Sequence, residues 1–392
     1  MTLFSDDPHA RAASGDSAGP DPDAVDESEQ SPRLSRRGSI GAVLVVVAFV
    51  LLMVMALSPA PYVIEAPGPV FNTLGYNHPV GQTPTNADEK KPLIVVSGHK
   101  TYPTKGALDL LTVSEIGTPQ QLPNWGQVIQ AWFSSSHEVI PVGVAYPPGE
   151  DVTQQNAENA QAMTDSQKDA VAAALNQLGY DFPQHVVVQQ VVDGPAKGVV
   201  KVGDEILTVN GVAIKGVQSL RDQVKKNGTD TPATIVVLRD GKQKSLSVTP
   251  EKASGSVVIG IGATMKYDFP FEVTIQLDNV GGPSAGQMFA LGIMDKLTPD
   301  SLNGGAHVAG TGTIDNEGNV GAIGGIRQKM YGARDAGATV FLAPASNCDE
   351  VTGHIPDGLH VYAVKTLSDS IKVLDAVRTG SSTSGLATCP TS

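Results

Sequence analysis

Eighteen consecutive residues without a charged side chain, 40–57, constrain this chain more than any other feature. A helix rises about 1.5 Å per residue, so this run covers roughly 27 Å, close to the thickness of a bilayer's hydrocarbon core. We therefore predict a single transmembrane helix over residues 39–58. Arg33, Arg36 and Arg37 precede it, which predicts a cytoplasmic N-terminus and an extracytoplasmic remainder. A cleaved signal peptide and a buried globular helix are the alternatives.

The segment before this run, residues 1–38, has a very different composition. It holds eight Asp or Glu and four Arg, is rich in Ser, Ala and Pro, and has few large apolar side chains. Such a segment buries too little surface to offset the entropy lost on ordering, so we predict a disordered cytoplasmic tail. The chain has a formal net charge of -13 and no basic stripe, which argues against a nucleic-acid partner.

The residues after the apolar run divide into strand-rich and helical parts. Residues 59–150 alternate short apolar runs with Gly and Pro, which predicts a strand-rich membrane-proximal segment that packs on the C-terminal domain. Residues 151–180 follow as an expected helical connector with Gly179 as its cap. Residues 253–378 alternate expected strands and helices, and residues 379–392 form an expected C-terminal tail. The predicted fold class is α+β.

Between these parts, residues 181–252 have the pattern of a compact β-rich domain. The dipeptides Asn210-Gly211 and Asp240-Gly241 each separate two expected strands, as hairpin turns do. A short helix is expected from about Ser219, whose hydroxyl is its predicted cap.

This unit resembles a bacterial PDZ domain. The resemblance rests on two stretches of sequence, Gly194-Pro195-Ala196 and Gly203-Asp204-Glu205-Ile206-Leu207-Thr208-Val209-Asn210-Gly211. It implies a groove between the strand 186–192 and the helix from Ser219, where an extended peptide adds as a further strand. A packing module without a ligand is the alternative.

Ser284 is the candidate nucleophile. It lies between an expected strand at 271–277 and an expected helix at 285–297. Free backbone N–H groups at a helix N-terminus stabilise an oxyanion, so Ser284 and Ala285 form the expected oxyanion region. An ordinary N-cap is the structural alternative for this serine.

Lys329 is the candidate base that a weakly nucleophilic serine requires. It lies on the apolar face of an expected helix at 326–336, near the positive end of the helix dipole. Burial there would lower its pKa from ~10.4 toward ~7 or 8, as a base near neutral pH needs. A surface lysine on a partly buried helix is the alternative.

The sequence around these two residues resembles the proteolytic domain of Lon-type serine peptidases. The resemblance rests on Gly282-Pro283-Ser284-Ala285-Gly286, Gly310-Thr311-Gly312, Gly324-Gly325-Ile326, and Ala333-Arg334-Asp335-Ala336-Gly337-Ala338. It implies a Lon-type domain over residues 253–378, in which Ser284 and Lys329 form a catalytic dyad supported by the Thr311 hydroxyl. Over most of the membrane-external chain, the resemblance extends to membrane-anchored bacterial proteins with a PDZ domain before the Lon-type domain, whose opening after the anchor is matched by Pro61-Tyr62-Val63-Ile64-Glu65-Ala66-Pro67-Gly68. No cofactor and no metal are expected.

Two departures from longer Lon enzymes matter. Gly281 stands where many of them have an acidic residue, and the sequence has no Gly-x-x-x-x-Gly-Lys-Ser/Thr phosphate loop. We therefore expect an ATP-independent serine endopeptidase at the cell membrane that cuts flexible or partly unfolded extracytoplasmic proteins. Its expected partners are protein or peptide substrates and the membrane; no oligomeric state is predicted.

Two other functions remain open from the sequence. Gly-Pro-Ser-Ala-Gly also fits the nucleophile elbow of an α/β-hydrolase-like esterase, for which His307, His354 and His360 are candidate bases. The chain is alternatively a catalytically inactive PDZ scaffold protein.

The two cysteines, Cys348 and Cys389, both lie in the part placed outside the cytoplasm. That compartment favours a disulfide between them, and two free thiols are the alternative.

Overall fold

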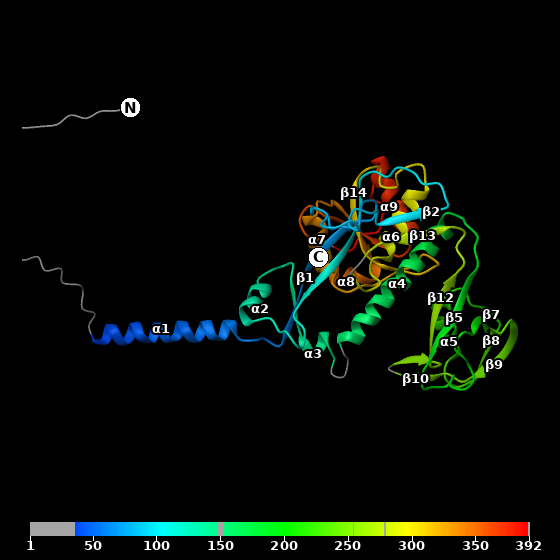
Figure 1. Ribbon diagram of the computed structural model, residues 1–392, viewed down its shortest axis with the longest axis horizontal. Helices are drawn as coiled ribbons and strands as arrows, with labels where there is room; N and C mark the ends of the chain where they lie inside the picture. The colour runs from blue at the N-terminus through cyan, green and yellow to red at the C-terminus, as the bar shows by residue number, and fades with distance from the viewer. Residues whose placement is uncertain (1–35, 148–151, 254, 278–279, 391–392) are drawn as a thin grey trace, which may run out of the picture. The chain divides into compact units, whose positions relative to one another are not determined.

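The computed structural model describes residues 36–147, 152–253, 255–277 and 280–390. It divides the chain into two units, residues 1–56 and 57–392, and each is described by itself (Figure 1). Most of the predicted disordered tail, residues 1–35, lies outside the described residues, whereas residues 36–38 are helical.

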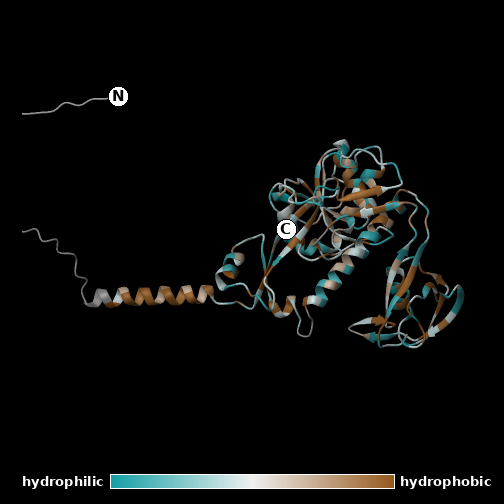
Figure 2. Cartoon of the chain, viewed as in Figure 1, coloured by the Kyte–Doolittle hydropathy of each residue, from teal (hydrophilic) through white to brown (hydrophobic). Residues whose placement is uncertain are grey.

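Helix α1 (Arg36–Leu57) contains the apolar run and is hydrophobic along that length (Figure 2). Its window Ile40–Leu57 has a mean hydropathy of 3.1, and none of it is buried. Among the described residues, this helix alone is long and apolar enough to cross a membrane, a test that signal sequences and core helices of soluble proteins also pass.

A six-stranded mixed sheet organises the second unit. The strand order is β18-β17-β14-β3-β1-β4. The strands are β1 (Tyr62–Asn72), β3 (Ala107–Ile116), β4 (Glu138–Pro141), β14 (His307–Gly310), β17 (Val340–Pro344) and β18 (His360–Val364).

This sheet corrects the expected arrangement of residues 59–150. Three strands of that segment are half of the sheet itself, because β3 pairs in parallel with β14 and β1 pairs antiparallel with both β3 and β4. The segment therefore belongs to the same fold as the C-terminal part and does not merely pack on it.

Helices cover both faces of the sheet. On β17, Val340 and Leu342 belong to one apolar cluster, while Phe341 and Ala343 belong to another, as the alternation of side chains along a strand requires. The first cluster also contains residues of α4 (Val152–Gln177), α6 (Gly286–Leu297) and α9 (Leu367–Thr379), and the second contains residues of α7 (Ile326–Asp335).

Helix α4 occupies the predicted connector, but its second half is a core element. Its buried residues all lie from Met163 onward and include Val171 and Leu175. Several of its buried side chains are alanines, and such small residues let the helix approach α6 closely.

Smaller elements complete the larger part. Strand β2 (Ile94–Ser97) pairs with β13 (Glu272–Ile275), and β15 (Thr313–Ile314) pairs with β16 (Val320–Gly321). Short helices were not predicted from the sequence: α2 (Trp125–Trp132), α3 (Val142–Ala145), α8 (Cys348–Val351) and a 3-10 turn at Ala345–Asn347. Helix α2 begins with a capping box formed by Asn124 and Gln127.

The PDZ-like unit has a second sheet of order β12-β5-β6-β8-β9, with β7 paired to β6. Its elements are β5 (Gln184–Val191), β6 (Glu205–Val209), β7 (Val212–Ala213), α5 (Val217–Asn227), β8 (Ala233–Arg239), β9 (Lys242–Val248) and β12 (Ile261–Tyr267). A hairpin of β10 (Glu251–Ala253) and β11 (Ser256–Val258) precedes β12.

Local predictions for this unit are largely confirmed. Both turn dipeptides have positive φ angles, 50° and 78° at Asn210-Gly211 and 54° and 73° at Asp240-Gly241, and each joins two paired strands. The predicted cap is wrong by one turn, because α5 begins after Gly216 and Ser219 is its third residue. The Ser219 hydroxyl instead accepts a hydrogen bond from the Gly216 N–H at 3.0 Å.

Strand β12 corrects two predictions: the end of the PDZ-like unit at residue 252, and the position of its peptide groove. This strand lies beyond residue 252, yet it pairs with β5 over its whole length and places Met265 in the unit's core. Strand β5 therefore has neighbours on both sides, β12 and β6, and cannot accept a peptide strand. The free edge is that of β12, and a groove of about 440 Å³ lies between it and α5, lined by Leu220, Val224 and Ile261 among others.

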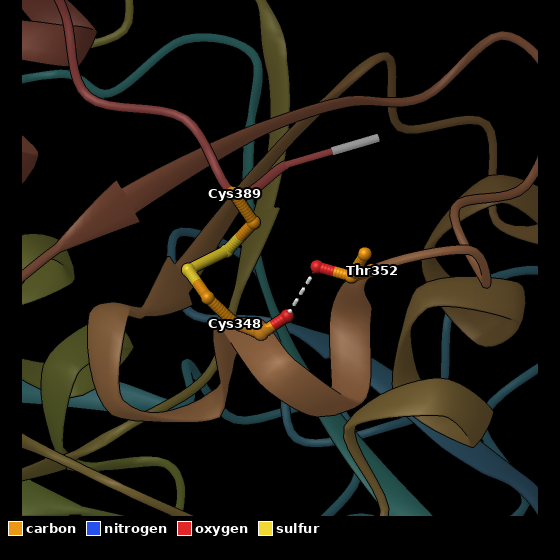
Figure 3. Close-up of a disulfide and its surroundings, with 3 residues drawn as sticks. All are labelled: Cys348, Thr352 and Cys389. Carbon is orange, nitrogen blue, oxygen red and sulfur yellow. Dashed lines mark hydrogen bonds between the residues drawn. A yellow bond between two sulfur atoms is a disulfide. The ribbon is translucent and has the colours of Figure 1, made fainter. Parts of the chain in front are cut away.

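Cys348 and Cys389 are joined in a disulfide with their Cα atoms 5.0 Å apart (Figure 3). The end of the chain also adds to β18, since the Ala363 N–H donates to the Ala387 carbonyl at 2.9 Å. The described part of the C-terminal tail is thus attached to the sheet.

Candidate active site

Ser284, Lys329 and Thr311 lie together in the folded chain. The Nζ atom of Lys329 is 2.8 Å from the Oγ of Ser284 and 3.3 Å from the Oγ1 of Thr311. Thr311 is fully buried, Lys329 is 3% exposed, and Ser284 is half-buried.

Three elements bring these side chains together from different sides of the sheet. Ser284 precedes α6 on one face, Lys329 is in the first turn of α7 on the other, and Thr311 follows the last residue of β14. The carboxyl end of a parallel strand is where α/β folds place their ligand crevices, because chains leave the sheet there in different directions.

Helix α4 holds the turn that precedes Ser284. Gly282 has φ +83°, which favours glycine, and its N–H donates to the Asn159 carbonyl at 2.9 Å. The Ser166 hydroxyl donates to the Pro283 carbonyl at 2.9 Å. The helix expected to be a connector therefore fixes the position of the candidate nucleophile.

The backbone of Ser284 is held on its other side by the strand end. Its carbonyl accepts hydrogen bonds from the Gly312 N–H at 2.8 Å and from the Thr311 hydroxyl at 3.0 Å. Because the Thr311 proton is used there, its oxygen faces Lys329 with a lone pair. Helix α6 starts at Gly286, and in the described part of the chain no acceptor binds the N–H groups of Ser284 and Ala285.

Burial lowers the pKa of Lys329 from 10.5 to about 8, and the nearby Glu65 carboxylate opposes that shift. The N-terminal position on α7 also disfavours a positive charge. A lysine with this pKa is partly neutral near physiological pH and can then accept a proton.

Glu65 was not singled out from the sequence. It lies on β1 in register with Glu115 of β3 on one side and Glu138 of β4 on the other. Burial and then the two glutamates raise its pKa, and Lys329 lowers it. None of the three forms a salt bridge with Lys or Arg among the residues that the structure describes. The available signal was a carboxylate inside the apolar run Val63-Ile64-Glu65-Ala66.

A cavity of about 500 Å³ opens beside the pair. Its lining includes Glu65, Leu110, Val113, Met163, Ser284 and Lys329. The volume is within the range of small-molecule binding sites. Within the described ranges, no group of three or more His, Cys, Asp or Glu is arranged to hold a metal ion.

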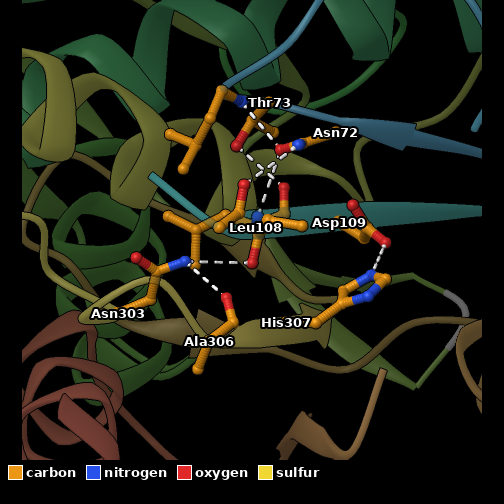
Figure 4. Close-up of polar contacts among 10 residues, drawn as sticks. Asn72, Thr73, Leu108, Asp109, Asn303, Ala306 and His307 are labelled. Atoms are coloured by element: carbon orange, nitrogen blue, oxygen red, sulfur yellow. Dashed lines mark hydrogen bonds and ion pairs between the residues drawn. The ribbon is translucent and has the colours of Figure 1, made fainter. Parts of the chain in front are cut away.

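The three candidate histidines lie elsewhere. His307 is the first residue of β14, four residues before Thr311 and hence about 13 Å from it along the strand. Its Nε2 is 2.5 Å from the buried Asp109 carboxylate, which raises the His307 pKa (Figure 4). His360 begins β18, and the Nδ1 of His354 contacts the Thr352 carbonyl at 2.9 Å. None of the three contacts Ser284 in the described structure.

The family model of the PDZ domain matches residues 154–249. The chain contains a PDZ domain. The match begins in α4, whose second half packs in the larger core, and ends before β12, which completes the PDZ sheet.

Curated proteins similar to this chain include Lon proteases. That of Buchnera aphidicola is 28% identical over 178 residues, 44% of this chain and 21% of the relative. That of Koribacter versatilis is 29% identical over 175 residues, which are 44% of this chain and 20% of the relative. That of Fusobacterium nucleatum is 30% identical over 188 residues, which are 44% of this chain and 24% of the relative. The chain thus spans about a fifth of the length of the relatives it matches, and it is a PDZ protein with weak similarity to proteases.

Solved structures similar to it include PDZ domains of SdrC-like proteins. The domain from Listeria monocytogenes is 26% identical and covers 20% of this chain and 85% of that one, with a TM-score of 0.19. The domain from Listeria innocua has the same identity and TM-score and covers 20% and 92%.

Proposed function

We propose that this chain is a membrane-anchored serine endopeptidase that uses Ser284 and Lys329 as a catalytic dyad. Its substrates are flexible or partly unfolded extracytoplasmic proteins, which the PDZ domain recruits, and it works without ATP. The single observation that carries the proposal is the 2.8 Å approach of a buried lysine amine to a serine hydroxyl at the mouth of a cavity.

The proposed reaction follows from the positions of these groups. Neutral Lys329 takes the proton of Ser284 as its Oγ attacks the scissile carbonyl carbon. The N–H groups of Ser284 and Ala285 hold the resulting oxyanion. Lys329 then protonates the leaving amine, and the acyl group is transferred to a water molecule that Lys329 deprotonates. Thr311 orients the lysine throughout.

Independent features support this assignment. The similarity to Lon proteases favours peptide hydrolysis over other acyl transfers. None of the three candidate histidines contacts Ser284 in the described part of the chain. The serine therefore has no imidazole base there, which does not favour the esterase. The intact pair argues against an inactive scaffold.

The anchor and its orientation are part of the proposal. Helix α1 has the length and hydropathy of a membrane span, and the arginines before it favour a cytoplasmic N-terminus. The disulfide supports an oxidising compartment for the rest of the chain.

The test compares membranes containing wild type with membranes containing Ser284→Ala, and identifies peptides released only by the former. We expect a distinct set of cleavage products, unchanged by added ATP. In the same assay Ile261→Asp, in the PDZ groove, should lower release from proteins but spare cleavage of a short peptide. Val212→Asp, at an exposed site of the same domain, is its matched control. Indistinguishable peptide sets for wild type and Ser284→Ala would contradict the proposal.

The pH dependence offers a second check. Cleavage of a short peptide should rise with pH through about 8, since the neutral amine of Lys329 is the base. Glu65 stabilises the charged amine, so Glu65→Gln should lower the Lys329 pKa further and move the rise to lower pH. The exposed Glu317→Gln is the control. A rise that stays in place or moves upward in Glu65→Gln would show that Glu65 does not act on the lysine.

A further inference from the structure

Helix α2 and the residue after it expose apolar side chains. Ile129 is 41% exposed, Trp132 55% and Phe133 89%. They are spaced i, i+3 and i+4 and so lie on one side of the helix; we call them the aromatic face. No Asp, Glu, Lys or Arg occurs between residues 116 and 137.

The other side of α2 is also apolar. Val128 is fully buried and Ala131 is 5% exposed, and both pack against Ala60 and Ile64. A helix that is apolar on both sides is normally covered on both sides, by protein or by lipid. Within the described chain only one side of α2 is covered.

Backbone hydrogen bonds fasten α2 to the residues that directly follow the apolar helix. The Trp125 N–H donates to the Ser58 carbonyl at 3.1 Å, and the Ala60 N–H donates to the Pro123 carbonyl at 2.8 Å. Ser58 is the next residue after Leu57, the last of the apolar window. Where Leu57 leaves a bilayer, Ser58 and the start of α2 must therefore be within a few ångströms of its surface.

We propose that the aromatic face of α2 inserts into the interfacial layer of the membrane that α1 spans. Tryptophan and other aromatic rings prefer this layer, and short amphipathic helices lie in its plane. Because the segment is uncharged, apolar contact holds it there and attraction to anionic headgroups does not. This inference rests on the proposed anchor, but not on the dyad.

The chain offers a direct probe, because its only two tryptophans are Trp125 and Trp132. Trp125→Phe leaves Trp132 as the sole emitter on the aromatic face. Trp132→Phe leaves Trp125, whose ring lies half-buried with its centroid 5.7 Å from that of Tyr62. Full-length protein is reconstituted into phosphatidylcholine vesicles with or without bromine on the acyl chains, and a second pair of vesicles contains anionic lipid.

We expect bromine to reduce Trp132 emission roughly twofold, since interfacial helices bury their apolar face about 5–10 Å deep. The loss should be smaller for Trp125 and the same with and without anionic lipid. Equal Trp132 emission in brominated and plain vesicles would overturn the inference. If Trp132 is then also shielded from acrylamide, a second copy or another protein covers the face instead.

Retention of the chain by the vesicles in alkaline carbonate separates the possible failures. Release would overturn the anchor and the interfacial contact together. Retention with unquenched Trp132 would overturn only the contact. Peptide cleavage by the same protein in detergent reports on the dyad independently of both.

Discussion

Lys329→Met should abolish measurable peptide cleavage and at the same time make the folded chain more stable. A positioned general base contributes about 10²–10⁴ to the rate, so kcat should fall by at least that factor. Methionine has nearly the same length and no charge, and it fills the buried site without a polar group. Loss of activity with gain of stability distinguishes a functional lysine from a structural one.

The sign of the stability change follows from proton binding. The Lys329 pKa is about 8 in the folded chain and 10.5 in the reference state. Between about pH 8 and pH 10.5 the unfolded chain binds more protons than the folded chain, so the free energy of unfolding rises with pH in this range. Below pH 8 both states are protonated and the folded chain bears the full cost of the buried charge, about 3 kcal/mol. Lys329→Met removes that cost at pH 7.

Urea unfolding at pH 7, together with peptide cleavage, measures both effects. The exposed Lys365→Met should change neither the midpoint nor the activity. If Lys329→Met were less stable than wild type, the lysine would be making favourable contacts in its charged form. If it kept its activity, Lys329 would not be the base.

Loss of the disulfide should lower the free energy of unfolding more than any other substitution proposed for this chain changes it. The bond closes a loop of 41 residues, for which the chain-entropy relation gives roughly 4 kcal/mol. Cys389 shares an apolar cluster with Val351, the last residue of α8. The same cluster contains Ile326 and Met330 of α7, the helix that carries Lys329. We therefore expect the double variant Cys348→Ser with Cys389→Ser to unfold at a much lower denaturant concentration than wild type. It should also lose peptide cleavage at a lower temperature than wild type.

Unfolding of wild type with and without reductant provides the matched comparison. The reductant should lower the free energy of unfolding of wild type and leave the double serine variant unchanged. Equal wild-type curves in both conditions, with free thiols detected in each, would mean that the bond does not form.

Features governed by local chemistry were predictable from the sequence. The turns at Asn210-Gly211 and Asp240-Gly241 depend on positive φ angles that these residues adopt readily. Ser284 and Lys329 were found from local motifs and helical periodicity, and the structure places them in contact.

Features created by long-range pairing were not predictable. Strand β3 joins β14 although some 200 residues separate them, and β12 joins β5 rather than the domain that follows it. Glu65 approaches Lys329 because β1 contacts α7 in the fold, and its apolar neighbours along the chain indicate burial but not this approach. The core role of α4 is not apparent from the sequence, because many of its buried residues are alanines, which give a weak apolar signal.

The most direct test of the central claim is a serine-directed phosphonate probe applied to full-length protein in membranes, followed by mass spectrometry of the labelled peptide. The account predicts a label on Ser284 that appears in wild type and disappears in Lys329→Met, but persists when His307, His354 and His360 are all replaced. Labelling of Ser284 that persists without Lys329, or no labelling at any pH from 6 to 10, would contradict it.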